Sequence, residues 1–193
     1  MATQNLYPNA AGDLTQFPTV EPSSINHFQA VDETSADDDT SYVQTNQEEA
    51  SVQKILIKEN STTTGASKTF TDNTNYNNYT NQWTAKPSDS SAFTVTDINN
   101  LQIGVQFTGD EEPTDQTDLF NIEDWPHNSG DTINSVTVTA RWKNAVGGAH
   151  QQRLRLTQIF ATVDYTAFVE TTGPFKIKAG AKVKIESGKL TIK

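Results

Sequence analysis

Three consecutive aspartates, Asp37 to Asp39, form the densest group of carboxylates in the chain. Calcium takes oxygen ligands, and carboxylates carried on a loop are a usual way for a protein to supply them. The spacing is not that of an EF-hand loop, and adjacent residues of an extended chain point in different directions. At most two of the three are expected to share an ion, so Asp37 and Asp39 are the candidate calcium ligands. The alternative is a solvated turn in front of a strand at Ser41–Thr45.

A second candidate site is the stretch NTNYNNYTNQW, residues 73–83, in which Tyr76, Tyr79 and Trp83 alternate with asparagines. Aromatic faces stack on sugar rings while amides bond to hydroxyl groups, so the composition is typical of an apolar platform with a few oriented polar groups. These three residues are the candidate glycan contacts. The alternative is a polar loop whose aromatic side chains cover the edge of a sandwich.

Catalytic patterns are weak in this chain. The three histidines, His27, His127 and His150, are scattered and lack the spacing of a metal-binding His-Glu-x-x-His motif. No Gly-x-Ser-x-Gly sequence supports a serine nucleophile, and the chain has no cysteine for a thiolate metal site. We therefore expect no enzymatic activity and no cofactor, with a hydrolase as the residual alternative.

The last twenty residues differ in charge from the rest of the protein. They hold six lysines and one glutamate, whereas the whole chain has a net charge of -10, so the preceding part carries -15. Three apolar pairs alternate with the lysines and are expected to form very short strands; they are Phe175/Ile177, Val183/Ile185 and Leu190/Ile192. Such short hairpins are marginal alone in water and become stable on another subunit. These six residues are the predicted oligomer interface.

The elements that carry these residues are predicted to be strands. Ser135–Trp142 alternates apolar and polar residues, and Arg153–Val169 does so with a change of phase at Thr157–Gln158. One extra residue turns every later side chain to the other face, so the phase change predicts a bulge. The other expected elements are strands at Ser41–Thr45, Ser51–Glu59, Phe93–Val95 and Leu101–Phe107, and one helical turn at Thr96–Asn100.

Turn-forming residues predict loops at 62–67, 108–118 and 144–149. Short strands separated by such loops indicate an all-β fold, namely an antiparallel β-sandwich of jelly-roll-like type. Residues 1–24 contain Pro8, Pro18 and Pro22 and few apolar residues, and are expected to form an extended arm laid across a neighbour or left disordered.

Composition restricts the partners. An acidic chain lacks the basic face that phosphate contacts need, so no nucleic acid is expected to bind. No run of about 18 apolar residues predicts a membrane span, and the first residues, MATQNLYPNAAGDL, lack the charged and apolar regions of a signal peptide. Synthesis in the cytoplasm of a host without membrane insertion is the expectation.

Four segments together resemble a group of virion structural proteins from tailed phages and related prokaryotic viruses. They are INHFQAVDETSADDDTSYVQT (25–45), WTAKPSDSSAFTVTDINNLQIGV (83–105), DLFNIEDWPHNSGDTINSVTVTARWKN (118–144) and RLTQIFATVDYT (155–166). The second and third of these stand in the reverse order to that of the group. The resemblance implies a capsid- or tail-associated subunit of the decoration, cementing or fibre type, located in the virion.

Together these observations predict three parts: an extended arm at 1–24, a β-sandwich domain at 25–172 and a basic oligomerisation tail at 173–193. The expected function is that of a non-enzymatic virion structural protein that acts through contacts between subunits. Its expected partners are other virion proteins and copies of itself, with a trimer as the first expectation. The alternative is a carbohydrate-binding adhesin or fibre module that uses Tyr76, Tyr79 and Trp83.

Overall fold

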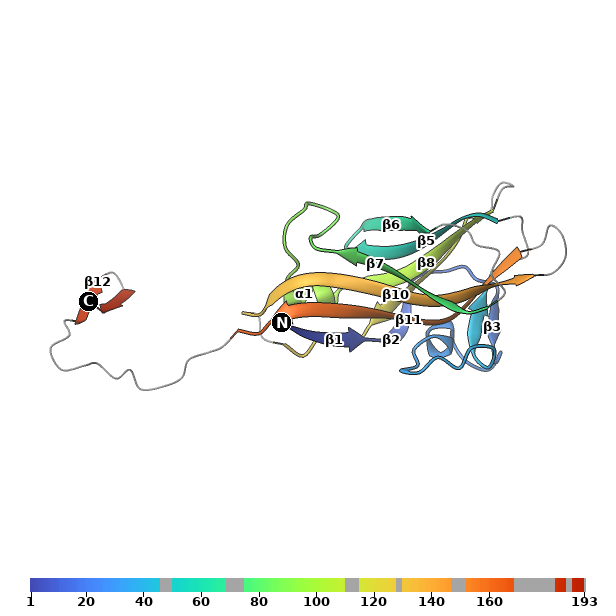
Figure 1. Cartoon of the computed structure of the whole chain (residues 1–193), viewed down its shortest axis with the longest axis horizontal. Coiled ribbons are helices and arrows are strands. Elements are labelled where there is room, and N and C mark those ends of the chain that lie inside the picture. The colour runs from blue at the N-terminus through green and yellow to red at the C-terminus, as the bar shows by residue number, and fades with distance from the viewer. Residues whose placement is uncertain are drawn as a thin grey trace.

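The computed structural model of the chain describes residues 1–45, 50–68, 75–109, 115–127, 130–146, 152–168, 183–186 and 189–192. Most of these residues lie in two antiparallel sheets that pack face to face (Figure 1). The only helices among them are a short 3-10 helix at His27–Ala30 and α1 at Val95–Asn99. The expected all-β class and the two-sheet arrangement are confirmed.

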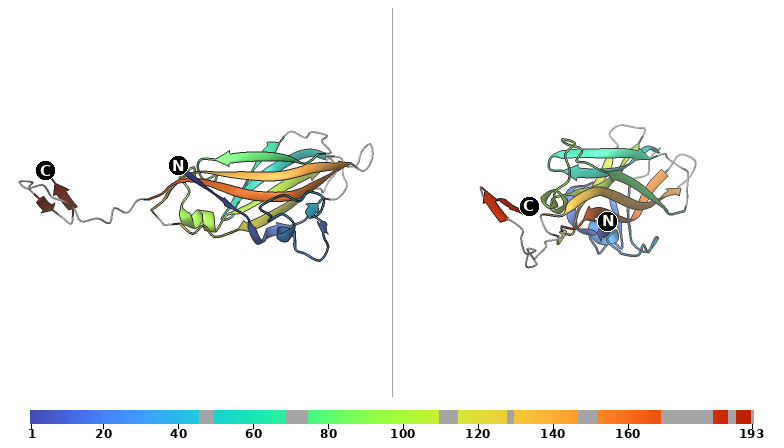
Figure 2. Two further views of the ribbon diagram at one scale, coloured as in Figure 1. Left: turned by 60° about the horizontal axis from the view of Figure 1, so that its bottom comes forward. Right: turned by 60° about the vertical axis from the view of Figure 1, so that its left-hand side comes forward.

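The six-stranded sheet has the order β3-β4-β11-β10-β7, and β1 also pairs with β11. Its strands are β1 (Ala2–Leu6), β3 (Thr19–Glu21), β4 (Tyr42–Gln44), β7 (Asn77–Trp83), β10 (Thr132–Val146) and β11 (Gln152–Thr166). The two longest strands, β10 and β11, form a hairpin that runs the length of the sheet (Figure 2).

The five-stranded sheet has the order β2-β9-β8-β5-β6. Its strands are β2 (Pro8–Thr15), β5 (Ala50–Glu59), β6 (Thr62–Lys68), β8 (Gln102–Gly109) and β9 (Gln116–Ile122). Strands adjacent in sequence pair within the two large sheets at β3–β4, β5–β6, β8–β9 and β10–β11, and these pairs do not by themselves define a jelly roll.

The core lies between the two sheets and is built from the alternating apolar residues of both. Ile55, Ile57, Ile103 and Val105 come from the five-stranded sheet, and Val138 faces them from β10; each is fully buried. Of these, Ile103, Val105 and Val138 were expected on one face of their strands, because successive side chains of a strand point to opposite faces.

The predicted bulge in β11 is confirmed. Arg141 pairs with Gln158 while Trp142 pairs with Leu156, so Thr157 is the extra residue. Side chains at 154 and 156 are buried before the bulge, and those at 159, 161 and 163 are buried after it. The change of phase in the sequence therefore corresponds to a change in the register of the strand.

Two local predictions are wrong. Phe93–Val95 is not a strand, because the Thr94 hydroxyl caps the amide of Asp97 and Val95 begins α1, which covers most of the helical turn that was expected. Residues 62–67 are not a loop but lie in β6, since three β-branched threonines favour a strand; the turn lies before them, where Asn60 has a φ of 53°.

The expected loops at 108–118 and 144–149 are shorter within the described residues. β8 runs to Gly109, β9 begins at Gln116 and β10 runs to Val146.

The first 24 residues, which were expected to form an extended arm, contain three strands that pair with strands of their own chain. β1 pairs with β11, β2 with β9, and β3 with β4. Leu6 and Phe17 anchor this segment, with exposures of 1% and 2%. Few apolar residues are enough here because two of them reach the core, so the segment is part of both sheets.

The chain ends in a separate hairpin of β12 (Val183–Glu186) and β13 (Lys189–Ile192), which forms its own two-stranded sheet. Val183 pairs with Ile192 and Ile185 with Leu190. The short strands expected at 183–185 and 190–192 are therefore present. Phe175 and Ile177, also predicted to lie in the tail interface, are outside the described residues.

Candidate functional site

The acidic loop, residues 32–41, lies across the outer face of the six-stranded sheet. Arg141 alternates with buried residues of β10 and therefore points outward. Its Nε and Nη2 donate to the two carboxylate oxygens of Asp38 at 2.7 and 2.9 Å. The buried hydroxyl of Thr157, the bulge residue of β11, donates to the backbone oxygens of Asp38 and Ser41. The bulge and the arginine thus hold the loop at both its backbone and its side chain.

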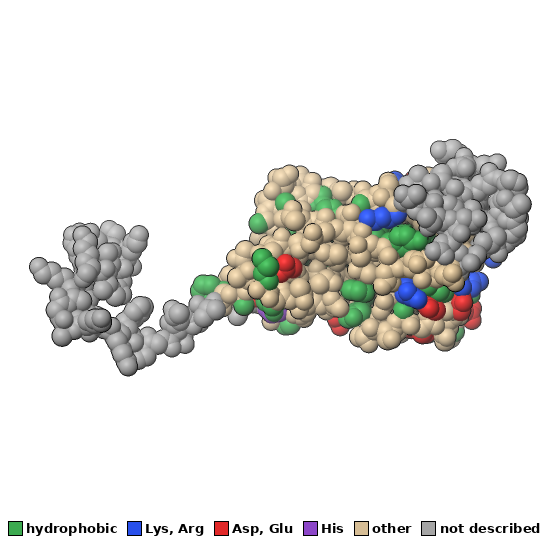
Figure 3. Space-filling model, viewed as in Figure 1, with side chains coloured by type: hydrophobic (Ala, Val, Ile, Leu, Met, Phe, Trp, Pro, Cys, Tyr) green, Lys and Arg blue, Asp and Glu red, His purple; other side chains and the backbone are tan. Residues whose placement is uncertain are grey.

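Asp39 is the centre of a second set of contacts on the same face. Lys143 Nζ donates to both of its carboxylate oxygens at 2.6 and 2.7 Å, and Arg155 Nη1 donates to one at 3.0 Å. The hydrogen bond from Lys143 is the main cause that lowers the pKa of Asp39. Figure 3 shows acidic and basic side chains gathered close together on this part of the surface. These partners, 103 to 116 residues away in the chain, were missed in the sequence.

The candidate calcium ligands point to different partners. Asp37 accepts the amide of Ser41 at 3.1 Å and lies beside Glu33, whereas Asp39 contacts Lys143 and Arg155. Among the described residues, no group of three or more acidic or histidine side chains is placed to hold a metal ion. The cations that meet the aspartates here are side chains of β10 and β11.

Tyr76 belongs to the same cluster and not to a free aromatic platform. Its hydroxyl donates to Asp39 at 3.1 Å, and Lys143 Nζ lies 4.4 Å from the centre of its ring. Burial, followed by the nearby carboxylate of Asp39, raises the pKa of Tyr76. A cation on the ring face occupies the position that a sugar would need.

The other two candidate glycan residues face the opposite side of the sheet. Tyr79 stacks on Trp142 with ring centres 4.1 Å apart and an angle of 9°, and Trp83 packs against the core. The structure therefore does not bring Tyr76, Tyr79 and Trp83 onto one surface. Their arrangement matches the other interpretation of the stretch, in which the aromatic residues cover the edge of the sandwich.

Glu33 is the one carboxylic acid of the loop with a strongly raised pKa. Burial is the first cause, the charge of Asp37 and a hydrogen bond to it follow, and the pKa of Glu33 reaches about 7. The folded protein thus binds a proton more tightly than the unfolded chain between pH 4.5 and about 7. Stability from this proton is complete below pH 4.5 and is lost as the pH rises to 7.

Replacing Glu33 by glutamine should remove this pH dependence. We expect Glu33→Gln to match the wild type near pH 4.5 and to be more stable by about 1–2 kcal/mol above pH 7, less than full linkage gives because water screens the group. Urea unfolding between pH 4 and 8 measures the difference. As a control, Asp37→Asn should retain part of the dependence, because burial of Glu33 is the larger cause. Parallel curves for wild type and Glu33→Gln would contradict the prediction.

The two described histidines pair with carboxylates that anchor the chain. His27 Nδ1 lies 2.7 Å from the buried Asp118, and His127 contacts Asp131 and Gln4 through its two ring nitrogens. Asp118 also accepts hydrogen bonds from the backbone amides at positions 16 and 17, so Asp118 fixes the end of β2 to β9. The pairing of His27 joins residues 91 apart, which is why spacing along the sequence did not reveal it.

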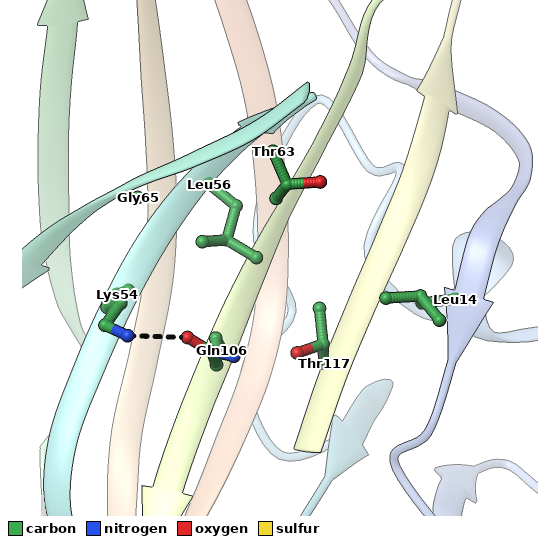
Figure 4. A pocket seen from close by; sticks show the side chains of 7 residues that line it. All are labelled: Leu14, Lys54, Leu56, Thr63, Gly65, Gln106 and Thr117. Carbon is green, nitrogen blue, oxygen red and sulfur yellow. Dashed lines mark hydrogen bonds between the residues drawn. The ribbon is translucent and has the colours of Figure 1, made fainter. Parts of the chain in front are cut away.

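A shallow hollow of about 360 Å³ lies on the outer face of the five-stranded sheet. It is lined by Leu14, Lys54, Leu56, Thr63, Gly65, Gln106 and Thr117 (Figure 4). Lys54 Nζ donates to Gln106 Oε1 at 2.8 Å, so the charged group is held against the floor. The mixed lining suits contact with surface side chains of another protein more than enclosure of a small ligand.

The register of the tail hairpin places its apolar residues together. Directly opposed residues of an antiparallel pair lie on the same face, and so do residues two apart in one strand. Val183, Ile185, Leu190 and Ile192 therefore share one face of the hairpin, and Lys184, Glu186, Lys189 and Thr191 share the other. We call the first of these the apolar tail face. Of all the predicted site residues, these four are the set that the backbone brings onto one surface.

Comparisons with protein-family models, with characterised proteins and with solved structures give no match to this chain. The described part of the chain also contains no helix with the length and apolar character needed to span a membrane. Evidence on function therefore comes from the geometry and from the sequence pattern.

Proposed function

We propose that this chain is a non-enzymatic structural protein of a virus particle that acts through contacts between subunits. The observation that carries the proposal is the apolar tail face, where four aliphatic residues lie together on a two-stranded hairpin. A hairpin of this size is not stable by itself in water, and each aliphatic side chain gains about 1.5–3 kcal/mol when it is buried. The hairpin is therefore suited to being covered by another subunit.

We propose that the apolar tail face is buried against the tail hairpins of other copies of the same chain. A hairpin with one apolar face can join its equivalents around a symmetry axis, with the lysine-bearing face turned to solvent, and a trimer is the first expectation. The charges favour association as well, because the tail carries +5 and the rest of the chain -15. Opposite charges on subunits accelerate docking and select the orientation.

The proposal that the protein belongs to a virus particle is based on the resemblance of four segments to virion structural proteins. The two-sheet body with charged groups paired across its outer face agrees with a rigid subunit, and the proposed roles are capsid decoration, cementing or attachment to a tail or fibre. A jelly-roll relationship and other virion proteins as partners belong to the same proposal. The proposed location is the virion, after synthesis in the cytoplasm of the host.

The full chain with Val183, Ile185, Leu190 and Ile192 all changed to serine tests the proposal. We expect the wild type to sediment as an oligomer at micromolar concentration and the variant to lose the tail-dependent assembly, so that it sediments as no more than a dimer, with unchanged circular dichroism of the body. The matched control changes Lys184, Glu186, Lys189 and Thr191 to serine and should retain the oligomer. If the apolar variant and the control assemble equally, the proposed role of the tail is wrong.

A second readout concerns the particle. Purified particles lacking the protein should take up the wild type and the control variant, but lose at least tenfold in uptake of the apolar variant. Equal uptake of all three would show that the tail has no part in attachment.

A further inference from the structure

The free edge of β6 is long, regular and uncharged over most of its length. β6 is the last strand of the five-stranded sheet, and its outer side pairs with no described strand (Figure 1). Its sequence, TTTGASK, contains no proline and has one charged residue, at the end. Its register with β5 is continuous from Thr62 to Lys68, without a bulge. Outward backbone N–H and C=O groups on such an edge are available to another strand.

The other edge strands carry features that oppose pairing. β2 has Pro8, an exposed Asp13 and two shifts of register, while β1 and β3 have five and three residues. The edge of β7 is capped, because Lys68 Nζ donates to the backbone oxygen of Thr80 and contacts the Asn81 side chain. Short strands, prolines, bulges and lysines are the devices by which proteins protect sheet edges. β6 has only one of them, Lys68 at its end, and the ammonium group of that lysine is directed to the neighbouring edge of β7.

We propose that two copies of this chain pair antiparallel through their β6 edges, across a twofold axis, to form one continuous ten-stranded sheet. Full overlap of the seven residues places Gly65 opposite Gly65 of the second copy. Thr63 then lies opposite Ser67 of that copy, and Ser67 opposite its Thr63. The contact is isologous, which is the commonest form of dimer interface.

The register makes this edge complementary to itself. Lys68 lies opposite Thr62 of the second copy, so no like charges meet, and the Thr63/Ser67 pairs bring hydroxyl groups together on the outer face. Opposed Thr and Ser residues are a favourable cross-strand pair. The glycine at the axis keeps the centre free of side chains, and in each copy Leu56 fills the space beside it.

The tail hairpin fits this edge less well than a second copy does. The tail carries lysines at alternate positions, and the outer face next to β6 already presents Lys54 and Lys58 on β5. A tail strand added to β6 would increase positive charge on that face. The inference that this contact serves assembly depends on the proposed structural function. In that function, a second interface separate from the tail allows small oligomers to join into extended arrays.

Charge substitutions at Thr63 and Ser67 test the pairing. In the proposed register, Thr63→Glu/Ser67→Glu places carboxylates opposite each other twice, and Thr63→Lys/Ser67→Lys does the same with ammonium groups. Within one copy these positions face Lys58 and Lys54, so the glutamate variant keeps a stable fold. Either variant alone should dimerise about tenfold more weakly, whereas an equal mixture should form a heterodimer at least as tight as the wild-type dimer.

The measurement uses the full chain with the four apolar tail residues changed to serine, so that the tail does not contribute. Sedimentation equilibrium from 1 to 100 μM should show a dimer in this background, a dimer dissociation constant about tenfold higher for each charge variant alone, and a dimer again for the mixture. Circular dichroism checks the fold of every variant. A background protein that stays monomeric to 100 μM, or a mixture that behaves like its components, overturns the β6 contact. Neither result bears on the tail, whose test is loss of assembly in the β6-intact serine variant compared with wild type.

Discussion

The Gly104→Ala variant is expected to lose about 3 kcal/mol of unfolding free energy. Gly104 lies in β8, near the centre of the five-stranded sheet, opposite Leu119 of β9. A Cβ at this position would overlap the backbone oxygen of Asp118 and lie 2.8 Å from Leu119 Cδ2. Because the obstacle is the backbone of a paired strand, the sheet itself must move, which is the costly form of overpacking.

Gly65→Ala is the matched control for this effect. Its added Cβ would lie 2.7 Å from Leu56 Cδ2, the end of a side chain, on a strand at the edge of the sheet. A rotation of that leucine relieves the contact, so we expect a loss below about 1 kcal/mol. Urea unfolding at a concentration where the chain is dissociated measures both. Similar losses for the two variants would contradict the importance of the backbone at Gly104.

The strands that could be predicted from the sequence are those whose burial is set by local alternation. In Ile103–Phe107 of β8 and Val136–Trp142 of β10 every second residue is apolar and faces the core, so the period of two is visible within eight residues. The bulge at Thr157 was predicted for the same reason, since the phase change requires only the residues of β11 itself. Local patterns are sufficient wherever one strand face is apolar.

The segments that could not be predicted depend on contacts distant in the chain. β1 and β2 are held by Leu6 and Phe17, which are too sparse to make a period, and by pairing with strands more than 100 residues away. β6 has no buried large side chain, so its threonines resemble a loop in composition. Such strands become evident only when their partner strands are known.

The candidate sites follow the same division. Tyr76 and Asp39 were selected by residue type. Residue type does not show that Lys143 donates to the carboxylate of Asp39 and lies over the ring of Tyr76. The apolar pairs of the tail were selected by alternation, and the hairpin register places four of those residues on one face. The pattern along one strand thus shows which residues share a face of that strand. The partner of a charged side chain is distant in the sequence and is not shown by such a pattern.

The tail contact and the β6 contact would lead to different kinds of assembly. A tail that closes around one axis gives an oligomer of fixed size, as in a fibre, whereas a tail contact combined with a twofold β6 contact links such oligomers into a net, as in a decoration layer. Assembly size at high concentration therefore distinguishes the two within the proposed function. Loss of the β6 contact alone should leave the tail oligomer and abolish larger assemblies.

Asp118→Ala is expected to lower the unfolding free energy by about 3–5 kcal/mol. The carboxylate of Asp118 is fully buried and accepts the backbone amides of Gln16 and Phe17 at 2.7 and 2.9 Å and His27 Nδ1 at 2.7 Å. Its removal leaves the Phe17 amide and His27 Nδ1 without this acceptor and leaves the Gln16 amide with only the backbone oxygen of Thr117, and each buried donor that loses its acceptor costs about 1–3 kcal/mol.

The structure also predicts where this loss first appears. Asp118 ties the end of β2 to β9, so amide hydrogen exchange at Gln16 and Phe17 should accelerate before that of the β10–β11 hairpin. Asp13→Ala is the control, because Asp13 also anchors β2, through Gln102 and Lys58, but its side chain is 58% exposed. We expect a much smaller loss there, since water replaces exposed partners. If Asp118→Ala is no less stable than Asp13→Ala, the buried carboxylate is not what holds the first strands in the sheet.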